Sequence, residues 1–219
     1  KMMLCTTEKE FNAELEYLDM LNRHIVDGVI TGAHSLAVEE YKKIHKPIVA
    51  LDRYLGEDIP VIAVNHKEGG RLAAETLIQN GCRRVLHFRG KVTVESPYHD
   101  RHFEFARIME EHGIQTIDYE LGRNRLDSEY YKKAVKDVFT RGIDFDGVFG
   151  VDRPVIECMN ETIRRHRRVP EDVKFVAYDG TFITEMVEPP LTAIVQPIKE
   201  LARESVRLVC NLVNGKVYK

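Results

Sequence analysis

Apolar and polar positions along this chain follow two alternating periods, and the alternation repeats from one end to the other. Short apolar runs, each bounded by Gly, Pro, Asp or Asn, indicate buried strands. Between them, apolar residues three or four positions apart indicate amphipathic helices. Because single helices separate the strands, we expect right-handed crossovers and parallel sheets.

The pattern places each element along the chain. Strands are expected at residues 2–6, 26–31, 47–51, 61–64, 85–88, 116–121, 147–151, 174–178 and 193–196. Helices are expected at residues 10–23, 35–45, 67–80, 99–112, 128–141, 154–165, 182–188 and 197–214. Gly81, Gly113, Gly142 and Gly215 each follow a helix, where glycine favours the left-handed cap conformation.

The order of elements predicts an α/β fold with two doubly wound parallel-sheet lobes. The alternative is one continuous Rossmann-like sheet. Two lobes are favoured because polar residues gather at the ends of strands from both halves. The segment 2–6 resembles the middle of a buried strand. We therefore expect a first strand and helix of its lobe to lie outside this sequence.

Composition narrows the class of protein without naming a function. The chain has 219 residues, of which 43% are hydrophobic and 31% charged, ordinary values for a globular protein. A net charge of -3 gives no broad electrostatic footprint for nucleic acid. No apolar run approaches the roughly 20 residues of a membrane span, and no signal peptide is visible. Four widely spaced cysteines predict reduced, buried thiols in a cytoplasmic protein.

Charged side chains stand at the ends of several predicted strands. Asp52 and Arg53 end one, Asp152 ends another, Asp179 ends a third, and Arg101 opens a helix. The carboxyl ends of parallel strands are where α/β sheets bind ligands. Carboxylates accept several hydrogen bonds and a guanidinium donates several, a combination that suits sugar hydroxyls. The alternative is that these are turn residues and surface ion pairs.

An aromatic ring at such a cleft would offer an apolar face to a sugar ring, and Tyr98 and Phe88 are the candidates. Gly69-Gly70 lacks the spacing of a phosphate loop and instead predicts close packing or a tight turn. The basic run at 164–168 is interpreted as a solvated helix end rather than a nucleic-acid site. His99 and His102 are expected on a solvent-facing helix rather than in a zinc site.

Catalytic signals are weak. The sequence has no Gly-x-Ser-x-Gly elbow. Paired carboxylates at a cleft are compatible with hydrolase chemistry, but nothing distinguishes an acid from a nucleophile. We predict no enzyme activity, no metal and no cofactor.

Several motifs together resemble the LacI/GalR family of bacterial sugar-responsive regulators. They are Val-Asp-Gly-Val-Ile at 26–30, the strand ending in Asp-Arg at 47–53, the Gly-Gly helix at 65–81, and Phe-Asp-Gly-Val-Phe-Gly at 145–150. The most specific are Val-Pro-Glu-Asp-Val at 169–173, Tyr-Asp-Gly-Thr at 178–181 and Pro-Pro-Leu-Thr at 189–192. The Tyr-Asp-Gly-Thr form is similar to that of sucrose- or ribose-type repressors.

The resemblance implies two lobes with a sugar effector between them. Residues 1–88 plus 197–214 would form the amino-terminal lobe and residues 89–196 the carboxyl-terminal lobe. Asp52, Arg101 and Asp179 match the family's motifs best as sugar contacts, with Asp152 and Gln196 as further candidates.

The sequence also departs from the family's pattern. Val151 stands where the family often has Asn, Glu104 where it has Gly, and Asn65 where it has Asp. These departures bear on which effector is bound more than on the fold. Few basic residues converge on the predicted cleft, which favours a neutral sugar over a phosphorylated one.

The resemblance implies the effector-binding and dimerisation part of a transcriptional repressor. Its partners would be a sugar, a second copy of the chain and operator DNA, the last through an amino-terminal helix-turn-helix that this sequence does not contain. Some members of the family also take a phosphoprotein corepressor. Two alternatives stay open: a stand-alone sugar-binding protein of a transport system, and a small sugar-processing enzyme.

Overall fold

The chain forms two compact units, each built around its own parallel sheet. A computed structural model describes residues 2–7, 13–32, 36–92, 95–122 and 127–216. One unit consists of Lys1–Val64, Val94–Tyr98 and Pro197–Lys219, and the other of Asn65–Thr93 and His99–Gln196. Two separate parallel sheets, one in each unit, confirm the predicted α/β class and exclude the single continuous sheet.

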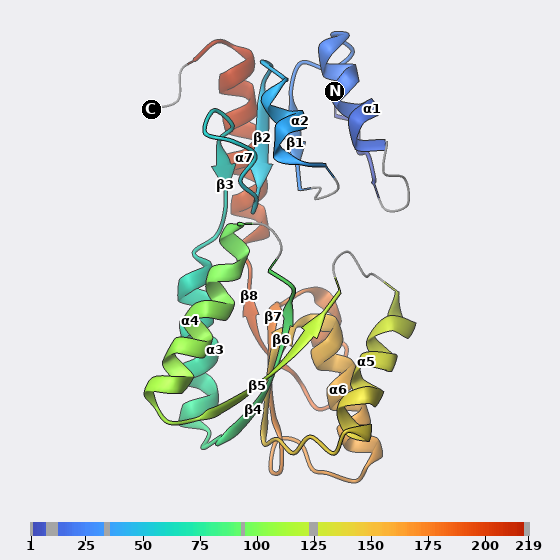
Figure 1. Ribbon diagram of the computed structural model, residues 1–219, viewed down its shortest axis with the longest axis vertical. Coiled ribbons are helices and arrows are strands. Elements are labelled where there is room, and N and C mark those ends of the chain that lie inside the picture. Colours follow the sequence, from blue (N-terminus) through green and yellow to red (C-terminus); the bar gives the residue numbers. More distant parts are fainter. Residues whose placement is uncertain (1, 8–12, 33–35, 93–94, 123–126, 217–219) are drawn as a thin grey trace. The chain divides into compact units, whose positions relative to one another are not determined.

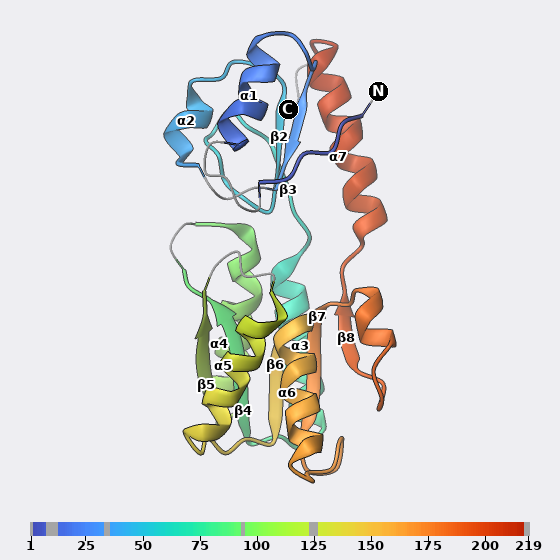
Figure 2. The ribbon, with the colours of Figure 1, turned by 90° about the vertical axis from the view of Figure 1, so that its right-hand side faces the viewer.

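The first unit has a three-stranded sheet in the order β1-β2-β3. Its strands are β1 (Val29–Thr31), β2 (Ile48–Leu51) and β3 (Val61–Ile62). Its helices are α1 (Ala13–Asn22), α2 (Val38–Lys42) and α7 (Ile198–Val213), and α7 packs against all three strands (Figure 2). Buried Leu18, Leu21 and Tyr41 close the core of this unit over the strands.

The second unit has a five-stranded parallel sheet in the order β5-β4-β6-β7-β8. Its strands are β4 (Arg84–Gly90), β5 (Gln115–Leu121), β6 (Gly147–Val151), β7 (Lys174–Asp179) and β8 (Thr192–Val195). Its helices are α3 (His66–Gln79), α4 (Asp100–Glu111), α5 (Ser128–Thr140) and α6 (Asp152–Arg164), with 3₁₀ turns η1 (Pro97–His99), which begins in the other unit, and η2 (Phe182–Glu185).

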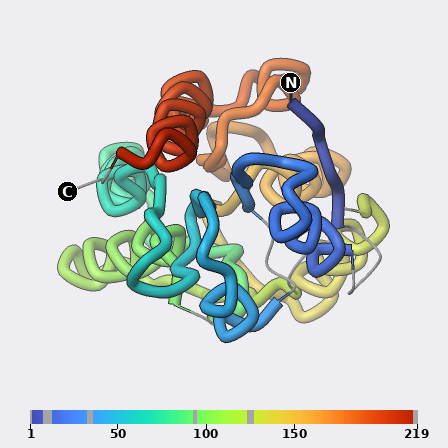
Figure 3. The backbone as a smooth tube through the Cα atoms, turned by 90° about the horizontal axis from the view of Figure 1, so that it is seen from above, coloured from blue at the N-terminus to red at the C-terminus, as the bar shows by residue number. Residues whose placement is uncertain are grey.

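Helices cover both faces of this sheet. α3 and α4 lie side by side on one face, and α5 and α6 cover the other (Figures 1 and 3). Burial on both faces explains why β4, β6 and β7 are buried along consecutive residues rather than at alternating ones, and why most of those residues are apolar. Gly81, Gly113, Gly142 and Gly215 all have positive φ, between +64° and +76°, which confirms their predicted role as helix caps.

The unit boundary differs from the predicted one. Residues 65–88 were expected in the amino-terminal lobe, but they lie in the second unit. The reason is packing: α3 lies against α4, and β4 pairs with both β5 and β6 in the middle of the large sheet.

Two further expectations are wrong. Residues 2–6 form no strand among the described residues, and Met2 and Leu4 are 89% and 90% exposed. A strand needs a neighbour for its backbone hydrogen bonds, and the described residues supply none. Of the cysteines, all of them free, Cys82 and Cys158 are buried as expected but Cys5 and Cys210 are exposed.

The Gly-Gly pair of α3 is explained by close packing, as predicted. A Cβ on Gly70 would lie 2.2 Å from the backbone oxygen of Arg101 in α4. A Cβ on Gly69 would lie 2.6 Å from the ring of Tyr178 in β7. Two adjacent glycines therefore let α3 approach both α4 and β7 at the point where Arg101 and Tyr178 meet.

Gly70→Ala should destabilise the protein by about 2 kcal/mol or more, because the added methyl group meets backbone that cannot rotate away. Urea unfolding followed by circular dichroism measures the loss. Gly90→Ala is the matched control, since no atom lies within 4 Å of a Cβ at that position. Equal stability of the two variants would contradict the packing argument.

Candidate ligand-binding site

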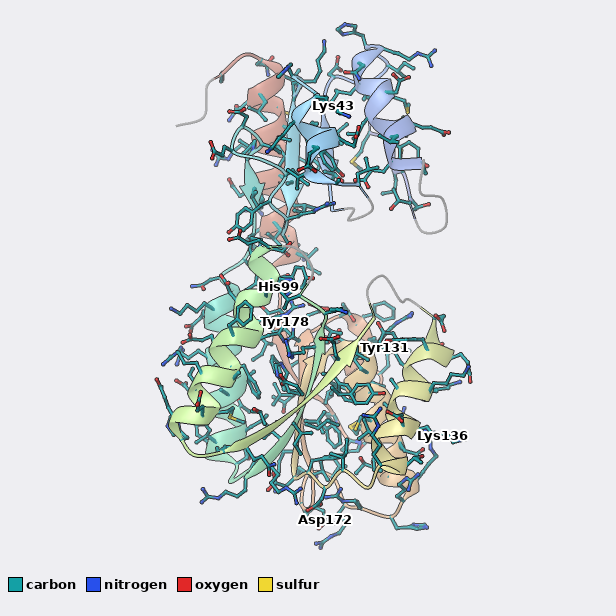
Figure 4. All side chains as sticks on the ribbon, in the orientation of Figure 1. Lys43, His99, Tyr131, Lys136, Asp172 and Tyr178 are labelled. Atoms are coloured by element: carbon teal, nitrogen blue, oxygen red, sulfur yellow. The ribbon has the colours of Figure 1, made fainter. Side chains whose placement is uncertain are left out.

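Polar side chains gather at the carboxyl-terminal edge of the five-stranded sheet. Asp152 follows β6, Asp179 ends β7, and Gln196 follows β8. Figure 4 shows Tyr178 and His99 near this edge and Asp172 at the opposite edge. The strand order also reverses at β4, and such switch points at the carboxyl edge are where open α/β sheets bind ligands.

Asp179 is the centre of this group. Its Oδ1 accepts a hydrogen bond from Gln196 Nε2 at 2.5 Å and lies 3.7 Å from Arg101 Nη1. Among the residues that the structure describes, its Oδ2 accepts no hydrogen bond and is left to an incoming donor. Its backbone has φ +103°, a strained conformation of the kind that clusters at functional sites.

Burial raises the pKa of Asp179, because it removes water from the charged carboxylate. The positive charge of Arg101 and the hydrogen bond from Gln196 oppose that rise, and the negative charge of Asp152 adds to it. The side chain is still 33% exposed, so the carboxylate is reachable by a ligand.

Arg101, near the start of α4, is held by an aromatic ring. Its Cζ lies 4.3 Å from the centroid of the Tyr178 ring, a cation–π contact. The Tyr178 hydroxyl lies 3.0 Å from Nδ1 of His66, the first residue of α3. Tyr178 and His66 are each 2% exposed, so the contact with His66 and the surrounding core hold the Tyr178 ring in place beside Arg101.

Asp152 holds the backbone of the site in place and does not offer its carboxylate to a ligand. Its carboxylate accepts hydrogen bonds from Gly180 N (3.1 Å), Thr181 N (2.8 Å) and Thr181 Oγ1 (2.6 Å). Asp152 is only 4% exposed. Gly180 has φ +62°, and a Cβ there would lie 2.8 Å from Val195 Cα. Asp152 thus fixes the turn that follows Asp179 and brings β7 and β8 together.

Four other residues were predicted as sugar contacts: Phe88, Asp52, Arg53 and Tyr98. Phe88 is 1% exposed in the core between β4, α5 and α6, so it has no face to offer to a sugar. Asp52, Arg53 and Tyr98 belong to the first unit. Arg53 is 3% exposed, donates to the Leu36 carbonyl and lies 5.6 Å from the Tyr41 ring centroid.

Asp52 resembles Asp179 in its place at a strand end, its backbone and its exposure. It follows a buried strand, has φ +51° and is partly exposed. Its role as a sugar contact therefore stays a prediction, as does that of Tyr98, which is also partly exposed.

A buried pair of histidines, His87 and His102, lies next to Arg101 and was not predicted from the sequence. His99 and His102 were expected to face solvent, but they are 3% and 6% exposed. His87 of β4 is fully buried, and its Nε2 lies 2.8 Å from His102 Nδ1. The signal was His87 within an apolar strand run, where a histidine needs a buried partner.

Burial lowers the pKa of His87, although the nearby carboxylate of Asp118 opposes the shift. Burial also lowers the pKa of His102 well below its usual range, and the charges of His87 and Arg101 add to the effect. Both imidazoles are therefore neutral at pH 7.

The basic run at 164–168 lies at the end of α6, as predicted, and three of its arginines pair with carboxylates. Arg164 and Arg165 both bind Glu161, at 3.0 and 2.8 Å. Arg168 binds Asp172 at 2.6 Å. Within the described ranges, no group of three or more His, Cys, Asp or Glu side chains could hold a metal. No helix in that same part of the chain is both long enough and apolar enough to span a bilayer.

The fold and these motifs have relatives of known class. The family description of a periplasmic binding protein-like domain matches residues 74–219, more than half of the chain. The chain therefore belongs to the family of periplasmic binding protein-like domains. Similar solved structures are LacI-family regulators, so the resemblance expected from the motifs is confirmed.

Two curated relatives of the chain are operon repressors. The chain is 33% identical over 216 residues to a ribose operon repressor of Halalkalibacterium halodurans, covering 98% of this chain and 64% of that protein. It is 32% identical over 203 residues to a sucrose operon repressor of Streptococcus mutans, covering 92% and 62%. The chain thus spans slightly less than two thirds of each relative's length.

The solved structures agree in fold. A periplasmic binding protein/LacI transcriptional regulator from Alkaliphilus metalliredigens, complexed with D-xylulofuranose, superposes with a TM-score of 0.84. It is 27% identical, over 99% of this chain and 80% of the other. The Lac repressor bound to ONPG is 22% identical with a TM-score of 0.80, over 95% and 64% of the two chains.

The stability of the chain should fall as the pH drops from 7 to 5. Burial lowers the pKa of His87 and His102 in the folded state, whereas the unfolded chain protonates each near pH 6.5. The unfolded state then binds more protons, so the free energy of unfolding falls by up to about 1.4 kcal/mol per pH unit for each histidine.

Urea unfolding at several pH values measures this slope. The double variant His87→Leu/His102→Leu should show a shallower slope in the same window, because it lacks both titrating groups. An identical slope in the two proteins would show that other groups cause the acid sensitivity.

Proposed function

We propose that this chain is the effector-binding and dimerisation part of a bacterial transcriptional repressor, and that its effector is a sugar. The observation that carries the proposal is the Asp179–Arg101–Gln196 group at the carboxyl edge of the large sheet. Support comes from relatives named as ribose and sucrose operon repressors.

The chemistry of the group suits a neutral sugar. Asp179 Oδ2 accepts a hydrogen bond from a sugar hydroxyl, and the carboxamide of Gln196 and the guanidinium of Arg101 hold Oδ1 in place. A phosphate in contact with Asp179 would be repelled by the carboxylate. A neutral ligand therefore fits this edge better than a phosphorylated one.

Control of transcription would work through differential affinity. The sugar shifts the protein toward the state that binds it better, and operator affinity changes by the same coupling factor. In this proposal two copies of the chain dimerise in the cytoplasm. DNA is bound by a helix-turn-helix outside these 219 residues, and the chain performs no chemistry on its ligand. A phosphoprotein corepressor belongs to the proposal as a second partner.

The alternative is a stand-alone sugar-binding protein that serves a transporter, since the fold is compatible with both. The repressor is favoured because the named relatives match 98% and 92% of this chain at 33% and 32% identity. A transport protein would bind the same sugar and leave DNA binding unaffected.

One sugar in a panel of neutral mono- and disaccharides and their phosphates should raise the melting temperature selectively. At a concentration of about 100 times Kd, binding to the folded state adds about 2.7 kcal/mol, a shift of roughly 5–10 °C for a chain of this size. Thermal unfolding by circular dichroism measures the shift, and chromatography shows whether the sugar is consumed. A shift only with sugar phosphates would contradict the neutral-sugar proposal.

Asp179→Asn should weaken binding of that sugar by about tenfold to a hundredfold, because it removes a charged acceptor. Asn tolerates the positive φ that Ala would not, so the variant keeps the local backbone. Isothermal titration calorimetry measures Kd.

The matched control is Asp144→Asn, which removes a carboxylate paired with Arg84 at the opposite edge of the same sheet. It should leave Kd unchanged. Unchanged affinity in Asp179→Asn as well would remove Asp179 from the site.

A further inference from the structure

We propose that His102, supported by His87 and Asp118, positions the guanidinium of Arg101 for the sugar. We call these four residues the histidine relay. The inference rests on the proposed function, because it assigns Arg101 to the effector site. Its three supporting residues make no contact with the ligand and act only through Arg101.

The relay is continuous from β5 to the start of α4. Asp118 Oδ1 lies 3.0 Å from His87 Nδ1, and His87 Nε2 lies 2.8 Å from His102 Nδ1. Arg101 Nε then donates to His102 Nε2 at 3.5 Å, the longest link. Arg101 Nη1 points the other way and lies 3.7 Å from Asp179 Oδ1.

These contacts fix one arrangement of protons. Arg101 has only donors, so His102 Nε2 must accept and the proton of a neutral His102 must sit on Nδ1. That proton is donated to His87 Nε2, which leaves the His87 proton on Nδ1 facing Asp118. Both imidazoles are therefore neutral Nδ1–H tautomers, and every donor in the relay meets an acceptor.

Arg101 needs such support because its side chain is long. The Tyr178 ring restrains one face of the guanidinium, but a cation–π contact by itself does not fix the rotation of that group in its own plane. A hydrogen bond to Nε removes that rotation and keeps the Nη groups directed to Asp179. An arginine that is already oriented loses less side-chain entropy when the sugar binds.

The far end of the relay is anchored at the sheet. Arg89 Nε of β4 lies 2.7 Å from Asp118 Oδ2, so the carboxylate is fixed by one cation while it accepts from His87. His87 also stacks on Phe149 of β6 at 5.4 Å and contacts Phe105 of α4 at 4.9 Å between ring centroids. The ring cannot flip without disturbing this core.

Acid should disrupt one contact of the relay, the hydrogen bond between Arg101 Nε and His102 Nε2. A second proton on His102 would turn its Nε2 into a donor facing Arg101 and place two cations together. The charged and titratable groups around the pair are Asp118, Arg89, Arg101 and His99, and all but Asp118 are basic. Because burial holds the pKa of His102 well below its usual range, we expect sugar affinity to be level between about pH 6.5 and 8 and to weaken only at more acidic pH.

The test measures Kd for the sugar identified in the panel, by calorimetry between pH 5 and 8. His102→Phe removes both links and should weaken binding about tenfold at pH 7.5, comparable to the loss of one charge-assisted hydrogen bond. His102→Gln keeps an acceptor for Arg101 and cannot protonate. It should bind within about threefold of the wild type. It should also lose the acid dependence that His102 causes and keep any that Asp179 causes, because Asp179 is present in both proteins.

Asp118→Ala tests the remote end of the relay without changing a buried side chain. Asp118 has a side chain that is 41% exposed, and we expect a roughly threefold to fivefold loss of affinity. Asp137→Ala is the matched control. Asp137 of α5 is 39% exposed and accepts a hydrogen bond from Tyr119, the neighbour of Asp118 in β5. It is not one of the residues of the histidine relay.

The outcomes separate the relay from the proposed function. Unchanged affinity in His102→Phe and Asp118→Ala, with binding lost in Asp179→Asn, overturns the relay alone. A wild-type chain that binds no sugar overturns both. Nitrogen-15 NMR of the ligand-free protein at pH 7.5 checks the proton arrangement directly, and an Nε2–H tautomer at His102 would also overturn the relay.

Discussion

The guanidinium of Arg101 is the group on which the candidate site depends. It lies over the Tyr178 ring, donates to His102 and is directed at Asp179, so it joins β7 to α4. That meeting requires α3 to come unusually close to both elements, and only glycine at positions 69 and 70 leaves the space. The site and the Gly-Gly motif therefore depend on the same close packing.

Most of the fold could be predicted from the sequence because the periodic signals were local. Glycine caps ended the helices at Gly81, Gly113 and Gly142, and apolar runs marked the buried strands. The unit boundary could not be predicted in the same way. Nothing local to residues 65–88 states that β4 pairs with β5 on one side and β6 on the other, since pairing is a property of the whole sheet.

The candidate site was predicted in part, for a related reason. Asp179, Arg101 and Gln196 stood at strand ends or a helix start, and the structure brings them together. Asp152 was placed at the same edge, but its three hydrogen bonds to the following turn were not visible from spacing. His87 and His102 were missed because a buried polar pair gives no periodic signal. Each histidine lies in a different element, and neither one alone reveals its partner in the sequence.

The arrangement suits the recognition of a sugar through hydrogen bonds, as the proposed function requires. One carboxylate oxygen is left available while the other is held by an amide and a cation, which suits hydrogen bonding to hydroxyls. Buried groups behind the site keep its donors oriented, so ligand affinity becomes sensitive to residues that never touch the ligand. Such sensitivity is useful to a regulator, whose output depends on a difference in affinity between two states.

A co-crystal structure with the sugar that stabilises the chain most would test the central claim directly. The account predicts that a sugar hydroxyl donates to Asp179 Oδ2 and that Arg101 keeps its position over Tyr178. A sugar bound away from the carboxyl edge of the five-stranded sheet, or an Arg101 turned away from Asp179 in the complex, would contradict it.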